Sequence, residues 1–200
     1  MNSGRALRSR SAGFTLVELM ATVTIVGVLA AVSVPSFVEH VREAKLSEVP
    51  INLGRCHRGV LEYFHSARGA DDGSSSGSQL PTGARRILCP AGNGGGFGNL
   101  FDLDGSANYV DPAVYDRPGG QTYRDIGLVL SEPIHACYYF YHNYSPWAGL
   151  RDSTWYRCLA FTDVDDDNML SIWFKTAFYR PEAGDFATGA VWHYPHGDDW

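Results

Sequence analysis

The chain has 200 residues, of which 44% are hydrophobic and 13% aromatic, and this is enough for one globular domain with its own core but too little for several. Only 19% of the residues are charged, with 22 acidic against 16 basic residues and a formal net charge of −6, so the composition predicts no basic surface for nucleic acid. The apolar content also excludes a chain that is disordered throughout.

A basic leader and an apolar segment open the chain. Residues 1–13 contain three arginines and no acidic residue, and residues 19–38 contain no charged side chain at all. About twenty apolar residues in an α-helix are long enough to cross the hydrocarbon layer of a membrane. A cleavable secretory signal is disfavoured because its apolar core is usually only about 7 to 15 residues long. Arginines mark the cytoplasmic end of a membrane helix, so the residues after Val38 are expected outside the cytoplasm.

Glu18 stands out because an acidic side chain inside an apolar segment costs free energy unless it finds a partner or reaches the interface. The sequence Gly13-Phe14-Thr15-Leu16-Val17-Glu18, with Pro35 placed 21 residues after Phe14, closely resembles the class III signal of type IV prepilins and type II secretion pseudopilins. That resemblance implies that prepilin peptidase cuts after Gly13 and that Phe14 becomes N-methylated. It also implies that Glu18 pairs with the new amino group of a neighbouring subunit, and that Pro35 bends the assembly helix.

The segment that follows predicts a second helical stretch. Over residues 39–66 apolar side chains recur mostly three or four positions apart, as on one face of an amphipathic helix that continues the membrane helix of residues 14–38. Pro35 and Pro50 each lack a backbone donor, so a kink or a local break is expected at both. The mixed charges on the other face are typical of a solvated helix surface.

Three later runs are dense in aromatic and other β-favouring residues and predict three antiparallel strands, at residues 134–144, 154–162 and 170–179. The predicted fold class is therefore α+β, with a long N-terminal helix packed on an antiparallel β-meander, similar to the αβ-roll of pilins. Residues 67–200 form the expected extracytoplasmic globular domain. In the aromatic run at residues 138–141, alternate members are expected to fill the core.

The turn after the second predicted strand carries three acidic residues at alternate positions, Asp163, Asp165 and Asp167, as the opening of a Ca²⁺ loop does. The stretch at residues 161–173 also resembles prepilin-like proteins of myxobacterial and delta-type sources, although Asp166 and Asn168 replace the two glycines of that pattern. An EF-hand is excluded because its usual glutamate falls on Phe174. Two interpretations stay open, a weak Ca²⁺ site that rigidifies the hairpin and a solvated acidic turn.

Four cysteines, an even number, lie in the part of the chain expected outside the cytoplasm, where disulfides form and persist. Two bridges are predicted among Cys56, Cys89, Cys137 and Cys158, with three possible connectivities. Cys137 and Cys158 lie on two predicted strands that could be neighbours. This favours a disulfide between them and leaves Cys56 to bond to Cys89. The spacing contains no C-x-x-C pair, so a zinc or thioredoxin-like site has no support.

These features favour a structural protein and not an enzyme, because no clustered catalytic constellation is found. The resemblance implies a subunit of a type IV pilus or of a type II secretion pseudopilus, assembled from the bacterial inner membrane into a filament in the periplasm or at the cell surface. Its implied partners are other pilin or pseudopilin subunits, prepilin peptidase and the inner-membrane assembly platform, and no nucleic acid is expected. The alternatives are a minor tip subunit that acts as an adhesion module and a simple membrane-tethered domain.

Overall fold

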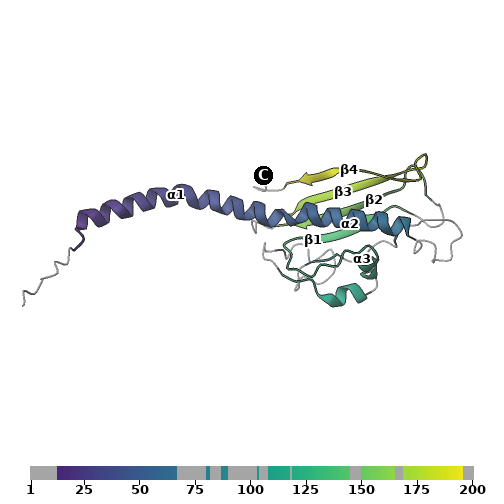
Figure 1. The fold of residues 1–200 in the computed structure, drawn as a ribbon, viewed down its shortest axis with the longest axis horizontal. Helices are drawn as coiled ribbons and strands as arrows, with labels where there is room; N and C mark the ends of the chain where they lie inside the picture. Colours follow the sequence, from purple (N-terminus) through teal and green to yellow (C-terminus); the bar gives the residue numbers. More distant parts are fainter. Residues whose placement is uncertain are drawn as a thin grey trace, which may run out of the picture. The chain divides into compact units, whose positions relative to one another are not determined.

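In the computed structural model the chain divides into two compact units, Met1–Val41 and Arg42–Trp200. Figure 1 shows the helices and strands, coloured from the N-terminus to the C-terminus. The structure describes residues 13–66, 80–81, 87–89, 103, 108–117, 119–144, 150–164 and 169–195.

Helix α1, Leu16–Leu46, provides the regular structure of the first unit. None of the residues of α1 is buried, and its large apolar side chains are exposed. The helix begins the one stretch of the described chain that is long and apolar enough to cross a membrane. It runs through Pro35 without ending, so the backbone hydrogen bond that this proline cannot donate interrupts the helix only locally.

Helix α2, Glu48–His65, lies wholly in the second unit, whose first residues, from Arg42, still belong to α1. The predicted break lies at Ser47, three residues before Pro50. Pro50 is the third residue of α2, and the first N–H groups of a helix have no acceptor within it, so a proline is tolerated there. One face of α2 is buried, with the residues Val49, Asn52, Leu53, Cys56, His57, Val60 and Phe64. A helix with one buried face is thus present over Glu48–His65, whereas residues 39–46 of the predicted amphipathic stretch belong to α1, which has no buried residue.

A four-stranded antiparallel sheet follows two short helices, η3 at Pro112–Asp116 and α3 at Gln121–Asp125. Its strands pair in chain order and form a meander. They are β1 at Cys137–His142, β2 at Trp155–Thr162, β3 at Ser171–Arg180 and β4 at Asp185–Tyr194. The α+β class and the three predicted strands are confirmed, but the prediction of only three strands is wrong.

The fourth strand escapes the sequence pattern because its alternation is interrupted. The register between β3 and β4 shifts within the strand, where Lys175 pairs with Val191 but Ala177 pairs with Thr188. One extra residue of β4 is therefore accommodated as a bulge. The bulge lets Phe186 and Val191 both pack against the core, although five positions separate them and a regular strand would turn them to opposite faces.

The main core lies between α2 and one face of the sheet, since α2 contacts β2, β3 and β4. Along β1 the expected alternation is present: Tyr138 and Phe140 are buried, Tyr139 is half-buried and Tyr141 is exposed. A smaller cluster forms on the other face around Cys137, with Ile87, Cys89 and Leu103.

The four cysteines form two disulfides, but the favoured pairing is wrong. Cys56 bonds to Cys158 and joins α2 to β2, while Cys89 bonds to Cys137. Strands β1 and β2 are neighbours, as expected. However, Cys158 pairs across the ladder with Phe140, which faces the core, whereas Cys137 pairs with Phe161 on the opposite face. Two cysteines on opposite faces of a sheet cannot be bridged.

Candidate functional site

The N-terminus of α1 brings together the residues that the sequence singles out. Thr15 precedes the first residue of the helix, and its Oγ1 accepts a hydrogen bond from the backbone N–H of Glu18 at 3.2 Å. In return the Glu18 carboxylate accepts from the Thr15 N–H at 3.5 Å and from the Thr15 hydroxyl at 3.3 Å. This reciprocal arrangement is a capping box, which satisfies N–H groups that the first turn of a helix leaves without partners.

The capping box gives Glu18 a local role that the sequence analysis missed, although the Thr15-x-x-Glu18 spacing is its signature. The carboxylate lies in the first turn of the helix, where the helix dipole favours a negative charge. Gly13 and Phe14 precede the cap and are exposed, with 76% of Phe14 accessible. The peptide bond between them and the carboxylate of Glu18 therefore lie at one accessible end of α1.

Three polar side chains of the apolar part of α1 are satisfied within the helix. The hydroxyl groups of Thr22, Thr24 and Ser33 donate to backbone carbonyls three or four residues earlier, at 2.7 to 2.8 Å. A polar group without a partner is expensive in hydrocarbon, so these bonds make the helix suitable for a lipid environment. With these three hydroxyl groups satisfied, most of the surface of α1 between Glu18 and Glu39 is apolar.

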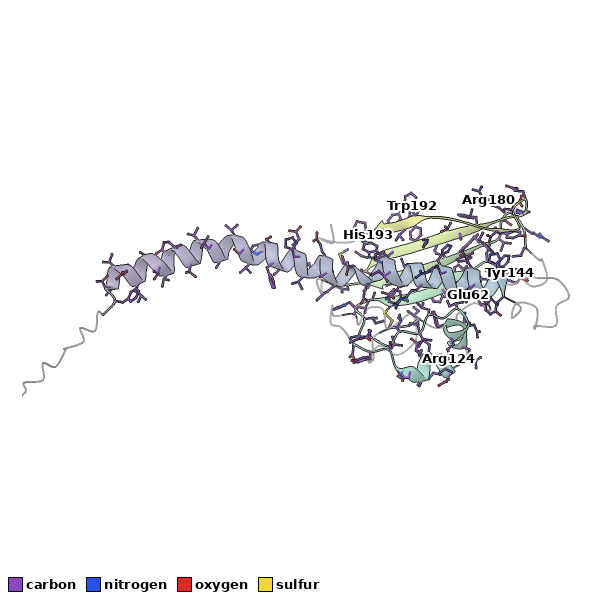
Figure 2. The ribbon with its side chains drawn as sticks, viewed as in Figure 1. Glu62, Arg124, Tyr144, Arg180, Trp192 and His193 are labelled. Carbon is purple, nitrogen blue, oxygen red and sulfur yellow. A yellow bond between two sulfur atoms is a disulfide. The ribbon has the colours of Figure 1, made fainter. Side chains whose placement is uncertain are left out.

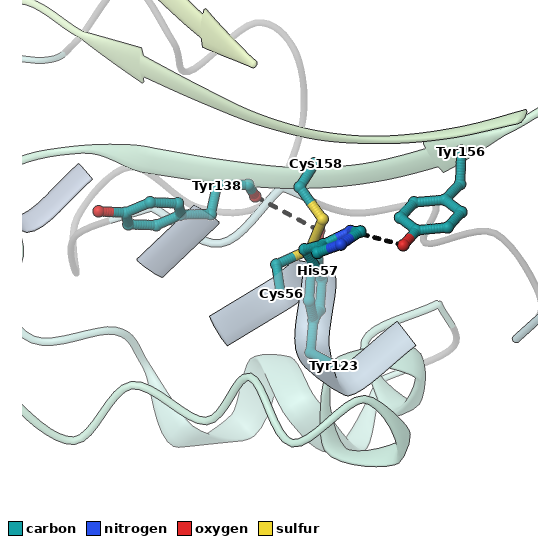
Figure 3. The surroundings of a disulfide bond; sticks show 6 residues. All are labelled: Cys56, His57, Tyr123, Tyr138, Tyr156 and Cys158. Carbon is teal, nitrogen blue, oxygen red and sulfur yellow. Dashed lines mark hydrogen bonds between the residues drawn. A yellow bond between two sulfur atoms is a disulfide. The ribbon is translucent and has the colours of Figure 1, made fainter. Parts of the chain in front are cut away.

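A second group of functional side chains ties α2 to the sheet (Figure 3). Next to the Cys56–Cys158 disulfide, the Nδ1 atom of His57 lies 2.6 Å from the hydroxyl oxygen of Tyr156. Burial lowers the pKa of His57 to about 4 and raises the pKa of the Tyr156 hydroxyl well above its usual range. Both groups are therefore uncharged at neutral pH, so the pair serves to hold the helix and not to transfer a proton.

The first turn of α2 is tied to β1 by a further hydrogen-bonded group. The hydroxyl group of Tyr138 accepts from Asn52 Nδ2 at 3.0 Å and donates to Glu48 Oε1 at 3.4 Å. The same carboxylate oxygen accepts from the backbone N–H of His135 at 2.8 Å. Asn52, Tyr138 and Glu48 thereby all have hydrogen-bond partners at a largely buried position. These bonds fix the position of α2 along the sheet.

The predicted calcium site lies mostly outside the described residues, which include Asp163 but neither Asp165 nor Asp167. Asp163 is 1% exposed and follows the last residue of β2. Among the residues that the structure describes, no group of three acidic, histidine or cysteine side chains is placed to hold a metal ion. Calcium binding by this turn stays a prediction.

Comparisons with known proteins agree with the features of α1. Residues 8–34 match the family model of the prokaryotic N-terminal methylation motif. The chain is 35% identical over 63 residues to the fimbrial protein EcpC of Eikenella corrodens, covering 32% of this chain and 40% of that protein. It is 40% identical over 55 residues to the type IV major pilin protein PilA of Myxococcus xanthus, covering 28% of this chain and 25% of that protein.

A similar match covers 70 residues of a type IV major pilin protein, PilE1, of Neisseria gonorrhoeae, at 34% identity, with 34% of this chain and 42% of that protein aligned. The chain therefore spans less than half the length of these curated relatives. No solved structure matches it significantly. The motif match includes Gly13, Phe14 and Glu18, so it covers the capped end of α1 described above.

Proposed function

We propose that this chain, which has the N-terminal segment of the type IV prepilin family, is a structural subunit of a type IV pilus. The observation that carries the proposal is the methylation motif at residues 8–34, which falls on the capped end of an apolar helix with no buried residue. The curated relatives are named as major pilins and fimbrial proteins, and this favours a pilus over a secretion pseudopilus.

The first step of the proposed pathway is removal of the leader by prepilin peptidase between Gly13 and Phe14. Both residues are exposed in the structure, which is what a protease needs. Cleavage takes away three arginines, so 13 basic and 22 acidic residues remain and the net charge becomes −9. It also creates an ammonium group on Phe14, and N-methylation keeps that charge.

Before assembly, α1 anchors the subunit in the inner membrane and the second unit lies outside the cytoplasm. This orientation is supported by the arginines of the leader, which favour the cytoplasmic side. The membrane shields the exposed apolar side chains of α1, and the capping box lowers the cost of placing Glu18 near hydrocarbon. The assembly platform then receives the subunit from the membrane.

In the filament, Glu18 exchanges its hydrogen bonds with Thr15 for a charge-assisted bond to the Phe14 ammonium of a neighbouring subunit. The hydrogen bonds with Thr15 join the carboxylate to neutral donors, whereas the new bond joins it to a full positive charge, so the exchange is favourable in a medium without water. Because the bond needs one ammonium opposite one carboxylate, it also sets how neighbouring helices align. The apolar surfaces of α1 then pack against those of other subunits.

The test is carried out in the native host with Glu18→Ala. We expect this variant to be cleaved and methylated like the unmodified chain but to be at least tenfold depleted from sheared surface filaments, because the neighbouring ammonium has no partner. Mass spectrometry of the Phe14 peptide in membranes and in the sheared fraction measures both quantities. Glu39→Ala, which removes an exposed acidic residue from the same helix, is the matched control.

Three results would contradict the proposal. Normal incorporation of Glu18→Ala into filaments would remove the assembly role of the carboxylate. A methylated Phe14 peptide that stays in the membrane fraction of the unmodified strain would favour a pseudopilus. If the leader remains intact, the chain is only a tethered domain.

A further inference from the structure

The sheet has a second face, on the side away from α2, where aromatic side chains gather. Tyr156 and Cys158 point to the core, so Arg157, which lies between them on β2, points to the other face. Cross-strand partners in a sheet share a face, so the residues that pair with Arg157 on the neighbouring strands point away from the core as well. We call this surface the aromatic face and define it by its central members, Tyr141, Trp155, Arg157, Phe174, Trp192 and Tyr194. The ladder pairs Tyr141 with Arg157 and Phe174 with Trp192.

Much of the aromatic face is open to solvent. Trp192 and Tyr194 on the edge strand β4 are 61% and 64% exposed, and Tyr141 on the other side is 45% exposed. Figure 2 shows Trp192 on β4 next to His193, which belongs to the opposite face. Large aromatic groups exposed together are uncommon on a soluble domain and mark a surface that contacts something else.

Arg157 places a positive charge in the middle of the aromatic face. Among the outward pairs from Trp155–Phe178 to Phe161–Ile172, Arg157 is the one charged residue. The carbon atom of its guanidinium lies 5.2 Å from the ring centroid of Trp155 and 4.7 Å from that of Phe174. Its Nε donates to Thr176 Oγ1 at 2.9 Å. In the described part of the chain, no carboxylate forms an ion pair with it.

We propose that the aromatic face binds an acidic glycan, in which a sugar with a carboxylate is flanked by neutral sugars. The C–H bonds on the faces of a sugar ring carry slight positive charge, which the negative faces of aromatic rings attract. The carboxylate of the acidic sugar accepts hydrogen bonds from the free N–H groups of Arg157, whose orientation Trp155, Phe174 and Thr176 fix.

The distribution of charge on the aromatic face favours an acidic glycan with flanking neutral sugars over other polymers. A nucleic acid or a polymer of uronic acids has a negative charge on every unit. It is repelled by a processed chain with a net charge of −9 whose central outward pairs on β2 and β3 contain one cation, Arg157. A neutral glycan would use the rings but not Arg157. In a filament each subunit repeats the face, so one polysaccharide would contact several copies with increased avidity; this extension rests on the proposed function.

The test uses the full-length chain in detergent micelles and two tetrasaccharides. Hyaluronan tetrasaccharide alternates acidic and neutral sugars, and fully N-acetylated chitotetraose, here called chitotetraose, is a neutral counterpart. We expect hyaluronan tetrasaccharide to bind at least tenfold more tightly than chitotetraose in isothermal titration calorimetry. Arg157→Met should abolish this preference, and Trp192→Ala should weaken binding of both at least fivefold. Tyr109→Ala, at a tyrosine that is 58% exposed outside the four strands, is the matched control and should change nothing.

The proposal is overturned if hyaluronan tetrasaccharide does not bind at millimolar concentration, or if both sugars bind equally. Tighter binding of a single-stranded oligothymidylate would assign the face to nucleic acid, and self-association that Trp192→Ala abolishes would assign it to a second copy of the chain. Tyr194→Ala, which removes an exposed ring, replaces any variant that does not fold and should weaken binding in the same way. The binding experiment does not require filament assembly. Its failure would therefore leave the proposed function, and the Glu18→Ala experiment that tests it, unaffected.

Discussion

His57 makes the fold sensitive to acid. It is 6% exposed, and burial, with a smaller contribution from the positive charge of Lys175, lowers its pKa from 6.5 to about 4 while the nearby Asp185 opposes that shift. The unfolded chain therefore takes up a proton at a higher pH than the folded chain does. The stability that depends on neutral His57 is complete above about pH 6.5 and is lost as the pH falls through that range toward 4.

We expect this histidine alone to lower the free energy of unfolding by about 3 kcal/mol between pH 6.5 and pH 4. Urea denaturation at a series of pH values measures the effect. His57→Gln should flatten this part of the pH dependence. An unchanged slope in His57→Gln would assign the acid sensitivity to other groups.

Gly59 lies where α2 closely approaches the backbone of Ile126, at the end of α3. A Cβ atom on this residue would overlap the backbone carbonyl group of Ile126, which no side-chain movement can relieve. We expect Gly59→Ala to destabilise the protein by about 2 kcal/mol, since overpacking exceeds the gain in helix propensity. Its melting temperature should fall by roughly 4 to 8 °C.

Gly54 in the same helix provides the matched control, because a Cβ there meets no atom within 4 Å. Gly54→Ala should leave stability unchanged or raise it by up to about 1 kcal/mol. Thermal unfolding followed by circular dichroism measures both variants. Equal effects of the two substitutions would mean that the contact with Ile126 relaxes without cost.

At the scale of the elements, the two disulfides constrain different parts of the fold. Cys56–Cys158 closes a separation of 102 residues and Cys89–Cys137 one of 48. Loop-closure entropy predicts a stabilisation of about 4.7 kcal/mol for the longer loop and about 4 kcal/mol for the shorter one. Replacing Cys56 and Cys158 together by alanine should therefore destabilise the protein slightly more than replacing Cys89 and Cys137, as chemical denaturation will measure. The reverse order would indicate strain in the longer bridge.

The elements also show how far the sequence predicts the fold. The apolar period of α2 and the aromatic runs of β1 to β3 are visible because each packs one regular face against the core. Strand β4 is hidden because a bulge near Gly189 interrupts its alternation. The disulfide pairing depends on the face to which each cysteine points, and that is fixed only when the register of β1 against β2 is known.

The candidate site is predictable to the extent that it is local. Gly13, Phe14 and Glu18 lie within six residues, so their spacing alone identifies them, and the Thr15 cap carries a signature of the same kind. The pair of His57 and Tyr156 joins residues 99 positions apart. The residues around His57 or Tyr156 in the sequence contain no pattern that predicts this contact, because it forms only when α2 packs on the sheet.

At the scale of the whole molecule, the second unit contains a complete core. Its buried apolar residues begin at Val49, and both disulfides lie within it. We expect a fragment of residues 42–200 to fold, to form the same two disulfides and to melt within a few degrees of the full-length chain in detergent. Circular dichroism and non-reducing peptide mapping check this expectation. A fragment without a cooperative transition would show that α1 contributes to the stability of the domain.

The order of the disulfides along the chain has a consequence for biosynthesis. The bond between Cys89 and Cys137 is nested inside the one between Cys56 and Cys158. In the proposed orientation the second unit crosses the membrane in the direction of synthesis, so Cys56 and Cys89 are exposed to oxidation before either native partner has emerged. The first bond that can form is thus a wrong one, and it must be exchanged through attack by a later thiolate. We accordingly expect a host without a disulfide isomerase to accumulate chains in which Cys56 is joined to Cys89, as non-reducing peptide mapping will measure.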